Sequence, residues 1–132
     1  MKPVGGKVTR CINKNALLEC SDNTGAKTLR ITNVKGYKGR KKRQVKAGVG
    51  DVVVCSVKKG APELKKETPL AVIIRQKKEW RRADGRRIKF EDNAAILVNE
   101  NLEPRGNEIK GAVAKEVIER YPSIGKIASI IV

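Results

Sequence analysis

The stretch from Arg75 to Phe90, RQKKEWRRADGRRIKF, concentrates the residue types best suited to binding phosphate. It holds eight Lys or Arg residues against two acids, Glu79 and Asp84, and it contains the only tryptophan of the chain. An arginine side chain presents a planar set of N–H donors that can bind two oxygens of one phosphate group. The segment is therefore a candidate site for a polyanion. Its basic members are Arg75, Lys77, Lys78, Arg81, Arg82, Arg86, Arg87 and Lys89.

The dipeptide Asp84-Gly85 in this stretch predicts a tight hairpin. A two-residue type I′ turn needs positive φ at both central positions, and Asp-Gly is a sequence that favours it. Folding there would place residues 82–83 opposite residues 86–87 on antiparallel arms. Like charges that face each other repel unless an anion screens them, which favours phosphate binding. The alternative is an edge that is charged only to block aggregation, for which about two or three lysines would suffice.

A second basic segment, KGYKGRKKRQVK, covers residues 35–46. It has seven bases in twelve residues, two glycines, no acid and no periodicity, which is typical of an exposed loop. Together the two segments hold 15 of the 30 basic residues, and we expect them to supply most of the phosphate contacts. The basic members of the loop are Lys35, Lys38, Arg40, Lys41, Lys42, Arg43 and Lys46.

The charge of the chain is unevenly distributed. The 132 residues carry a formal net charge of +16. Residues 1–90 hold 25 bases and 7 acids, whereas residues 91–132 hold 5 bases and 7 acids. A segregated excess of this size favours a polyanionic partner, and nucleic acid fits best. An anionic membrane is the weaker alternative because no amphipathic basic helix is visible.

The sequence offers little for catalysis or for metal binding. Histidine is absent, and the three cysteines Cys11, Cys20 and Cys55 are widely spaced, which fits neither the usual zinc motifs nor a disulfide framework. The adjacent acids Glu91 and Asp92 would point to opposite faces of an extended chain. We expect no enzyme activity, no metal and no cofactor. Reduced cysteines and the absence of an apolar leader predict a cytosolic location.

Short β-branched and apolar runs, bounded by Gly, Pro, Asn and Asp, predict strands along most of the chain. They fall within residues 7–12, 17–22, 26–34, 47–60, 70–77 and 91–99. Only residues 112–122 show helical spacing, and Pro122 would end that helix. The tail, residues 123–132, fits either a short helical turn or a strand. We therefore expect one domain, residues 1–132, with a mainly β fold: a small barrel, closed or partly open, with a helical region at about 112–128.

Turn residues add two more expectations. In the sequence DNTGAK, the side chain of Asp22 can accept hydrogen bonds from the backbone ahead of it, and Gly25 is expected at positive φ. Gly85 is expected at positive φ in the hairpin, next to Asp84.

Aromatic residues make up only 3% of the chain, which counts against reading of single-stranded bases on an aromatic platform. Only Tyr37 and Trp80 lie among the bases of the two segments, and Phe90 ends the second of them. Trp80 fits two roles equally well, a packing anchor at the base of the hairpin or a stacking platform. Recognition of phosphates and of the shape of folded RNA or a duplex fits better than base readout.

The helical segment near the C-terminus is expected to have two faces. Val113 and Val117 would pack on the barrel, and the opposite face would stay free. Either this helix is only a lid over the barrel, or its free face binds another protein. The candidate residues for that protein interface are Lys115, Glu116, Glu119 and Arg120.

One long pattern resembles a known family. Ala71 is followed by Val72-Ile73-Ile74, then nine residues, Asp84-Gly85, four residues, Phe90, two residues and Asn93. This spacing is similar to the signature of the universal large-subunit ribosomal protein L-fourteen family. The segments CSDNTGAK, VKGYKGR, AGVGD and VAKE agree with that family, and VKKGAPELKK and RQKKEWRR resemble its archaeal and eukaryotic branch. Ile96 departs conservatively from the valine usual there.

The resemblance implies more than the residues alone do. It implies a five-stranded β-barrel with a projecting β-ribbon and short C-terminal helices, and no catalysis. It also implies binding to large-subunit ribosomal RNA and bridges to small-subunit RNA. Implied protein neighbours are L-three and L-twenty-four-e, with a C-terminal surface on which an anti-association factor docks. A free-standing basic β-barrel that coats nucleic acid and a cycling translation factor are the competing interpretations.

Overall fold

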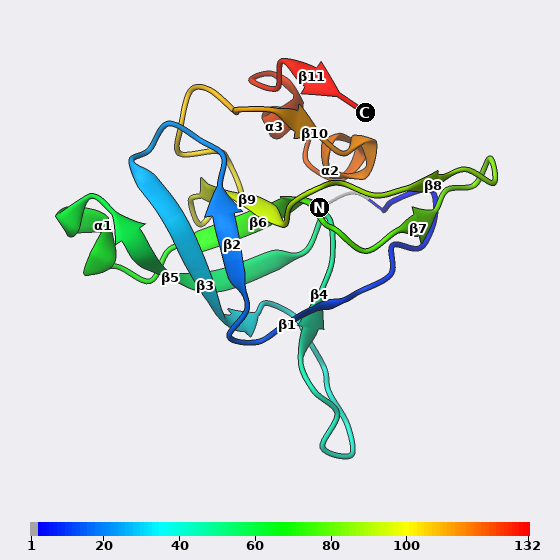
Figure 1. The fold of residues 1–132 in the computed structure, drawn as a ribbon, viewed down its shortest axis with the longest axis horizontal. Coiled ribbons are helices and arrows are strands. Elements are labelled where there is room, and N and C mark those ends of the chain that lie inside the picture. The colour runs from blue at the N-terminus through cyan, green and yellow to red at the C-terminus, as the bar shows by residue number, and fades with distance from the viewer. Residues whose placement is uncertain (1–2) are drawn as a thin grey trace.

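The computed structural model describes residues 3–132, and its centre is a closed barrel of five strands (Figure 1). The strands follow the order β2-β3-β5-β6-β9 around the barrel. Four of the pairings are antiparallel, and the barrel closes through a parallel pairing of β2 with β9. The bounds are β2 Leu17–Cys20, β3 Ala26–Val34, β5 Val52–Gly60, β6 Leu70–Arg75 and β9 Ala94–Val98. The mainly β barrel expected from the sequence is confirmed.

Strand β6 is buried on both faces. Residues 71–74 are each 0% exposed, which explains why LAVIIR is continuously apolar instead of alternating. One face points into the barrel, and the other is covered by the C-terminal region, where Ala114 N–H donates to the carbonyl of Ile74 at 3.2 Å. Strand β9 is buried at all five positions for the same reason.

Short elements surround the barrel. β1 Ile12–Asn13 pairs with β4 Lys46–Ala47, and β7 Trp80–Arg81 pairs with β8 Arg87–Ile88. β10 Ala112–Val113 pairs in parallel with β11 Ile130–Ile131. The helices are α1 Pro62–Lys65, α2 Lys115–Arg120 and α3 Pro122–Gly125. None of these helices has the length and apolar character needed to cross a membrane.

The C-terminal region differs from the single helix predicted over residues 112–122. Residues 112–113 form strand β10, and Ala114 remains extended with φ −66° and ψ 139° before α2 begins. The hydrogen bond from Ala114 to β6 holds this part of the chain against the barrel in the extended form. Tyr121, with φ −128°, separates α2 from α3, so Pro122 starts a second helix. The ambiguous tail contains both α3 and β11.

The segments at residues 7–12 and 47–60 differ in how well their strands were predicted. Of residues 7–12, only Ile12 lies in a strand. Within residues 47–60, the glycine-containing part forms a turn and the strand begins at Val52, as the β-branched run predicts. Gly50 has φ +87°, and the Asp51 carboxylate accepts a 2.8 Å hydrogen bond from Gly48 N–H. These contacts turn the chain before β5. The proline-containing segment between β5 and β6 contains the short helix α1.

Candidate nucleic-acid interface

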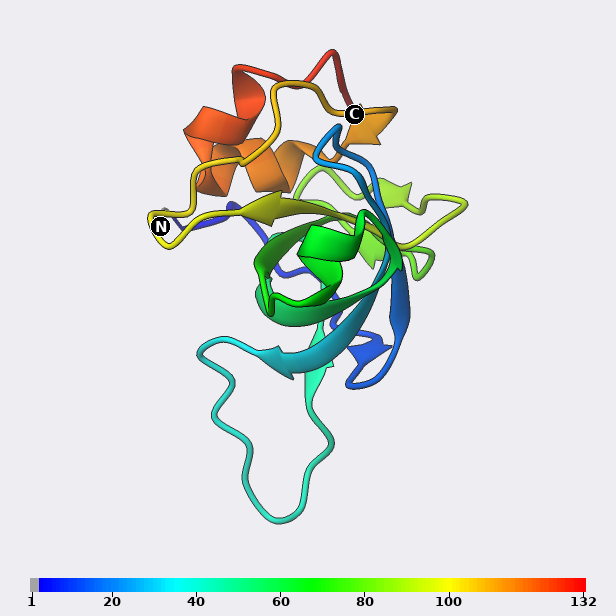
Figure 2. The same ribbon diagram turned by 90° about the vertical axis from the view of Figure 1, so that its left-hand side faces the viewer.

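The basic loop, residues 35–46, extends well away from the barrel between β3 and β4 (Figure 2). All seven of its bases are exposed, and none forms an ion pair with an acid in residues 3–132. The loop is braced near its stem by the Tyr37 hydroxyl, which donates to the carbonyl of Gln44 at 2.9 Å. The loop therefore presents an uncompensated positive charge to solvent.

The tip of the basic loop has an unusual backbone. Lys41 and Lys42 have φ of +55° and +58°, and Arg43 N–H donates to the carbonyl of Arg40 at 3.3 Å. Two consecutive left-handed residues within a four-residue turn are the pattern of a type I′ turn, which Asn-Gly would adopt with less strain. The turn leaves two adjacent lysines exposed to solvent.

The predicted hairpin is present, but its turn is a different one. Trp80 pairs with Ile88 and Arg81 with Arg87. Arg82 N–H donates to the Arg86 carbonyl at 2.8 Å, and Gly85 N–H donates to the Arg82 carbonyl at 3.0 Å.

The loop of the hairpin thus has three residues, 83–85, instead of two. Gly85 has φ +91° as expected, whereas Asp84 is not at positive φ, so the type I′ prediction is wrong. Asp84 instead accepts a hydrogen bond from Arg86 N–H at 3.0 Å, which stabilises a turn in which only the last residue is left-handed.

Six of the eight bases of the hairpin segment are exposed, namely Lys77, Lys78, Arg81, Arg86, Arg87 and Lys89. Arg81 and Arg87 face each other across the arms. The nearby acids form only long ion pairs, 3.7 Å for Arg86–Asp84 and 3.7 Å for Arg87–Glu79, between exposed side chains. Surface pairs of this kind contribute little, so most of the charge remains available to an anion.

Trp80 anchors the hairpin to the protein. It is 1% exposed, and its ring stacks on Phe90 with 6.0 Å between the centroids. Of the two roles left open by the sequence, the structure supports the packing anchor, because a buried ring offers no face to a base.

Two residues of the pattern that runs from Ala71 to Asn93 make hydrogen bonds at the base of the hairpin. Asn93 accepts a 2.8 Å hydrogen bond from Lys77 N–H, and Phe90 N–H donates to the carbonyl of Gln76. The side chain of Gln76 is completely buried and joins three segments. Its oxygen Oε1 accepts a hydrogen bond from Val49 N–H, and its Nε2 donates to the backbone carbonyls of Thr9 and Lys78. Gln76 was not singled out in the sequence, where a polar residue after an apolar strand gives little signal.

Arg75 does not belong to the exposed basic set. It is 9% exposed, and its guanidinium binds both carboxylate oxygens of Asp92 at 2.9 and 3.0 Å. It also donates to the Ser21 hydroxyl and to the carbonyls of Lys110 and Ala112. With its N–H donors occupied inside the protein, Arg75 ties β6 to the C-terminal region, and the prediction that it binds phosphate is wrong.

Arg82 and Glu116 form a second internal pair. Glu116 is 7% exposed and accepts hydrogen bonds from Arg82 and from the indole N–H of Trp80. The expectation that Glu116 lies on a free face of the helix is therefore wrong, because the hairpin covers that face. Arg82 also donates to the carbonyl of Val132 at 2.7 Å, so it is held at the base of the hairpin.

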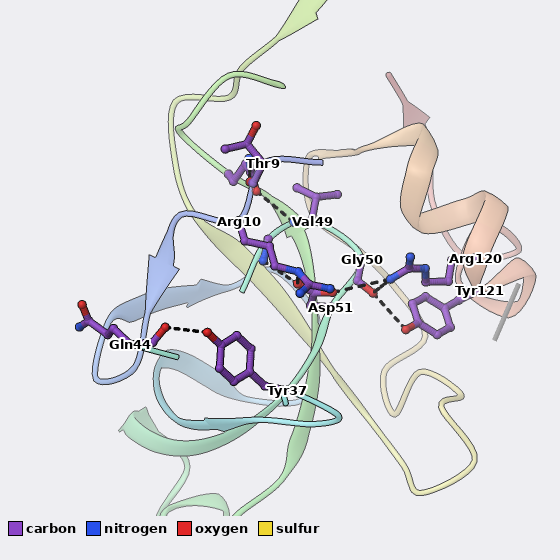
Figure 3. A network of polar contacts seen from close by, with 11 residues as sticks. Thr9, Arg10, Tyr37, Gln44, Val49, Gly50, Asp51, Arg120 and Tyr121 are labelled. Atoms are coloured by element: carbon purple, nitrogen blue, oxygen red, sulfur yellow. Dashed lines mark hydrogen bonds and ion pairs between the residues drawn. The ribbon is translucent and has the colours of Figure 1, made fainter. Parts of the chain in front are cut away.

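Of the other protein-interface candidates, two are exposed and one is bound inside the protein. Lys115 and Glu119 are exposed and lie 3.8 Å apart. Arg120 turns inward, where it donates to the carbonyl of Gly50 at 3.2 Å and lies 3.7 Å from Asp51. Tyr121 donates to the same carbonyl at 3.0 Å (Figure 3). Burial raises the pKa of the Tyr121 hydroxyl.

The expected turn at Asp22 and Gly25 is present. Gly25 has φ +100°, and one Asp22 oxygen accepts from the backbone and hydroxyl of Thr24. The other oxygen accepts from Leu97 N–H at 2.8 Å, so Asp22 also links the turn to β9. Burial, and next the neighbouring Asp22 carboxylate, raise the pKa of the Cys20 thiol to about 12.

Comparison with known proteins agrees with this architecture. Residues 11–132 match the sequence model of the family described as Ribosomal protein L14p/L23e. The chain is 58% identical to the large ribosomal subunit protein uL14 of Methanothrix thermoacetophila, over 96% of each chain. It is 51% identical to the uL14 proteins of Natronomonas pharaonis and of Methanocella arvoryzae, in each case over 100% of both chains. The chain therefore belongs to the ribosomal protein L14p/L23e family.

Proposed function

We propose that this protein is a structural, non-catalytic component of the large ribosomal subunit that binds the RNA of that subunit. The observation that carries the proposal is the placement of thirteen exposed bases on two segments that project from the barrel in different directions (Figure 1). Family membership supports the ribosome as the location, and hence the cytoplasm. The barrel is the rigid element that positions the two segments.

The mode of binding is contact with phosphates. Trp80 is buried, Phe90 is half-buried and stacks on it, and the half-buried Tyr37 is held to its own loop through its hydroxyl. The two segments therefore offer no fully exposed aromatic platform for stacking. The exposed Lys and Arg side chains match the backbone of folded RNA, whose recognition depends on charge and shape.

Salt titration of binding to purified large-subunit RNA tests this proposal. Counterion release predicts that affinity falls steeply with salt for about six or more phosphate contacts. Charge reversal of Arg40, Lys41 and Arg43, or of Arg81, Arg86 and Arg87, should weaken binding without loss of fold. Reversal of Lys58, Lys65 and Lys66, which are exposed near α1, is the matched control. Binding that hardly responds to salt would contradict the proposal.

The finer part of the proposal concerns the C-terminal surface. It comprises the exposed charged pair Lys115–Glu119 and the exposed apolar residues Ile130, Ile131 and Val132. We propose that this surface faces neighbouring proteins, L-three or L-twenty-four-e, and the interface with small-subunit RNA, and that an anti-association factor can dock there. Glu119→Lys should weaken subunit joining while leaving binding to large-subunit RNA intact or slightly tighter. Normal joining by this variant would leave the C-terminal region as a lid.

A further inference from the structure

A third group of basic side chains lies outside both basic segments, around a pocket of about 640 Å³. The walls come from three distant parts of the chain: the N-terminal residues 4–10, the turn at residues 48–51, and Arg120 of helix α2. Three cations, Lys7, Arg10 and Arg120, line the pocket together with one acid, Asp51. The pocket therefore has an excess of positive charge.

Asp51 organises this pocket. Its carboxylate lies 3.3 Å from Arg10 Nε and 3.7 Å from Arg120 Nη1, and the two arginines approach it from opposite sides (Figure 3). The same carboxylate accepts the 2.8 Å hydrogen bond from Gly48 N–H. One carboxylate thus positions two guanidinium groups whose combined charge it cannot neutralise.

The two arginines have different surroundings. The side chain of Arg10 is 58% exposed, whereas that of Arg120 is 23% exposed and donates to the carbonyl of Gly50. The Nε of Arg120 is buried and has no hydrogen-bond partner within residues 3–132. A guanidinium held in a partly desolvated wall interacts more strongly with an anion than one in bulk water does.

The pocket also lies next to the basic hairpin. A smaller cavity of about 180 Å³ shares Gly6, Lys7 and Val8 with it and extends to residues 80–84 of the hairpin. The lining of this smaller cavity mixes the bases Lys7, Arg81, Arg82 and Lys115 with the acids Asp84, Glu116 and Glu119. A nucleic-acid strand that follows the hairpin arm could reach Lys7 and then Arg10 across this surface of small net positive charge.

We propose that this pocket binds a phosphodiester group of the large-subunit RNA through Lys7 and Arg10, with Arg120 in its wall. The inference rests on the proposed function and deepens it. It assigns RNA contact to residues outside the two basic segments, and it gives an RNA-facing role to Arg120, which comes from the acidic part of the chain.

The test is the salt dependence of binding to purified large-subunit RNA by the full chain. Lys7→Gln and Arg10→Gln should each reduce the magnitude of the slope of log K against log salt by about 1, the value for one phosphate contact. Arg105→Gln, which removes one charge from an ion pair with Glu67 outside the pocket, should leave the slope unchanged. Lys7 keeps the test informative if Arg10→Gln perturbs the fold, because Lys7 makes no ion pair within the described residues.

Inorganic phosphate provides a second arm. Its titration into the wild-type protein, followed through the Nε–H NMR signals of Arg10 and Arg120, reports whether the pocket binds a free anion. Shifts of these signals with unchanged RNA slopes in both variants would assign the pocket to free phosphate and overturn the inference. Unchanged slopes without shifts would overturn it as well. A wild-type protein that binds the RNA without salt dependence would instead overturn the proposed function.

Discussion

The Glu116 carboxylate accepts hydrogen bonds from both Nε and Nη2 of Arg82, at 2.8 and 3.2 Å, although the two residues are 34 positions apart. The same carboxylate accepts from Trp80 Nε1 at 3.1 Å, and the Arg82 guanidinium lies 5.9 Å from the centroid of the Trp80 ring. Helix α2 therefore fixes the base of the hairpin. The direction in which the exposed arginines point depends on a residue from the acidic end of the chain.

We predict that Glu116→Ala lowers the free energy of unfolding by about 3 kcal/mol, because it leaves a largely buried guanidinium and an indole N–H without their acceptor. Glu119→Ala is the matched control on the same helix, and loss of its exposed pair with Lys115 should cost no more than about 0.5 kcal/mol. Urea unfolding measures both. Equal effects of the two substitutions would show that the Arg82–Glu116 contact does not hold the hairpin.

Arg75→Lys is predicted to be strongly destabilising although it conserves charge. A lysine cannot reproduce the two-oxygen contact with Asp92 while also donating to Ser21, Lys110 and Ala112. We expect a loss of about 3 kcal/mol in the free energy of unfolding. Lys77→Arg, two positions along and exposed, should change it by less than about 0.5 kcal/mol. A stable Arg75→Lys variant would refute this structural role.

The barrel was predictable because its strands carry a local signal. Strand β3, Ala26–Val34, has the bounds expected from its composition, and β5, β6 and β9 fall within the predicted runs. The five-strand closure came from the family resemblance, since the pairing of β2 with β9 joins residues far apart in sequence. Exposure of the basic loop also followed from its own composition.

The errors at the candidate site have a different origin. In the sequence, Arg75 and Arg82 are indistinguishable from their exposed neighbours, because their burial depends on partners at Asp92 and Glu116. Arg10 lies in a segment expected to be a strand, and its proximity to Arg120 is created only when α2 packs beside the turn at Asp51. Such long-range pairs leave no periodicity or spacing within either segment.

Gly60, at the end of β5, is predicted to tolerate a side chain poorly. Its φ is +143°, and an added Cβ would lie 2.7 Å from the carbonyl oxygen of Gly25 and 2.8 Å from the Cα of Ala26. Gly60→Ala should therefore cost more than about 2 kcal/mol of stability. Gly85→Ala is the control: its φ is also positive, but its Cβ would meet only Arg81 Nη2 at 3.9 Å, so it should cost about 1 kcal/mol. Thermal melting of both variants checks the order.

Stability is predicted to fall in alkaline solution through Cys55. Burial raises the pKa of this thiol to about 12, above the ordinary value of 9.0. The unfolded chain therefore loses the thiol proton first, and the stabilisation present below pH 9 is lost as pH rises towards 12.

Between pH 9 and 12 the contribution of Cys55 should decline by about 1.4 kcal/mol per pH unit. The Cys55→Ala variant lacks this term, so its deficit relative to wild type should shrink above pH 9 in urea unfolding. A deficit that stays constant from pH 8 to pH 10.5 would mean that the thiol ionises equally in both states.

The tip of the basic loop allows backbone strain and charge to be separated. Lys41 and Lys42 occupy left-handed conformations that cost about 1 kcal/mol or more each for residues with a Cβ. Replacing them with Asn-Gly should relax the turn and slow amide exchange of Arg43, whose N–H closes it. The same change removes two exposed cations, so the salt slope of RNA binding should fall by about two. Lys41→Gln with Lys42→Gln removes the cations without relieving the backbone, and should lose the same RNA slope with no slowing of exchange. If the Asn-Gly variant kept the full slope, the tip of the loop would not contact phosphate.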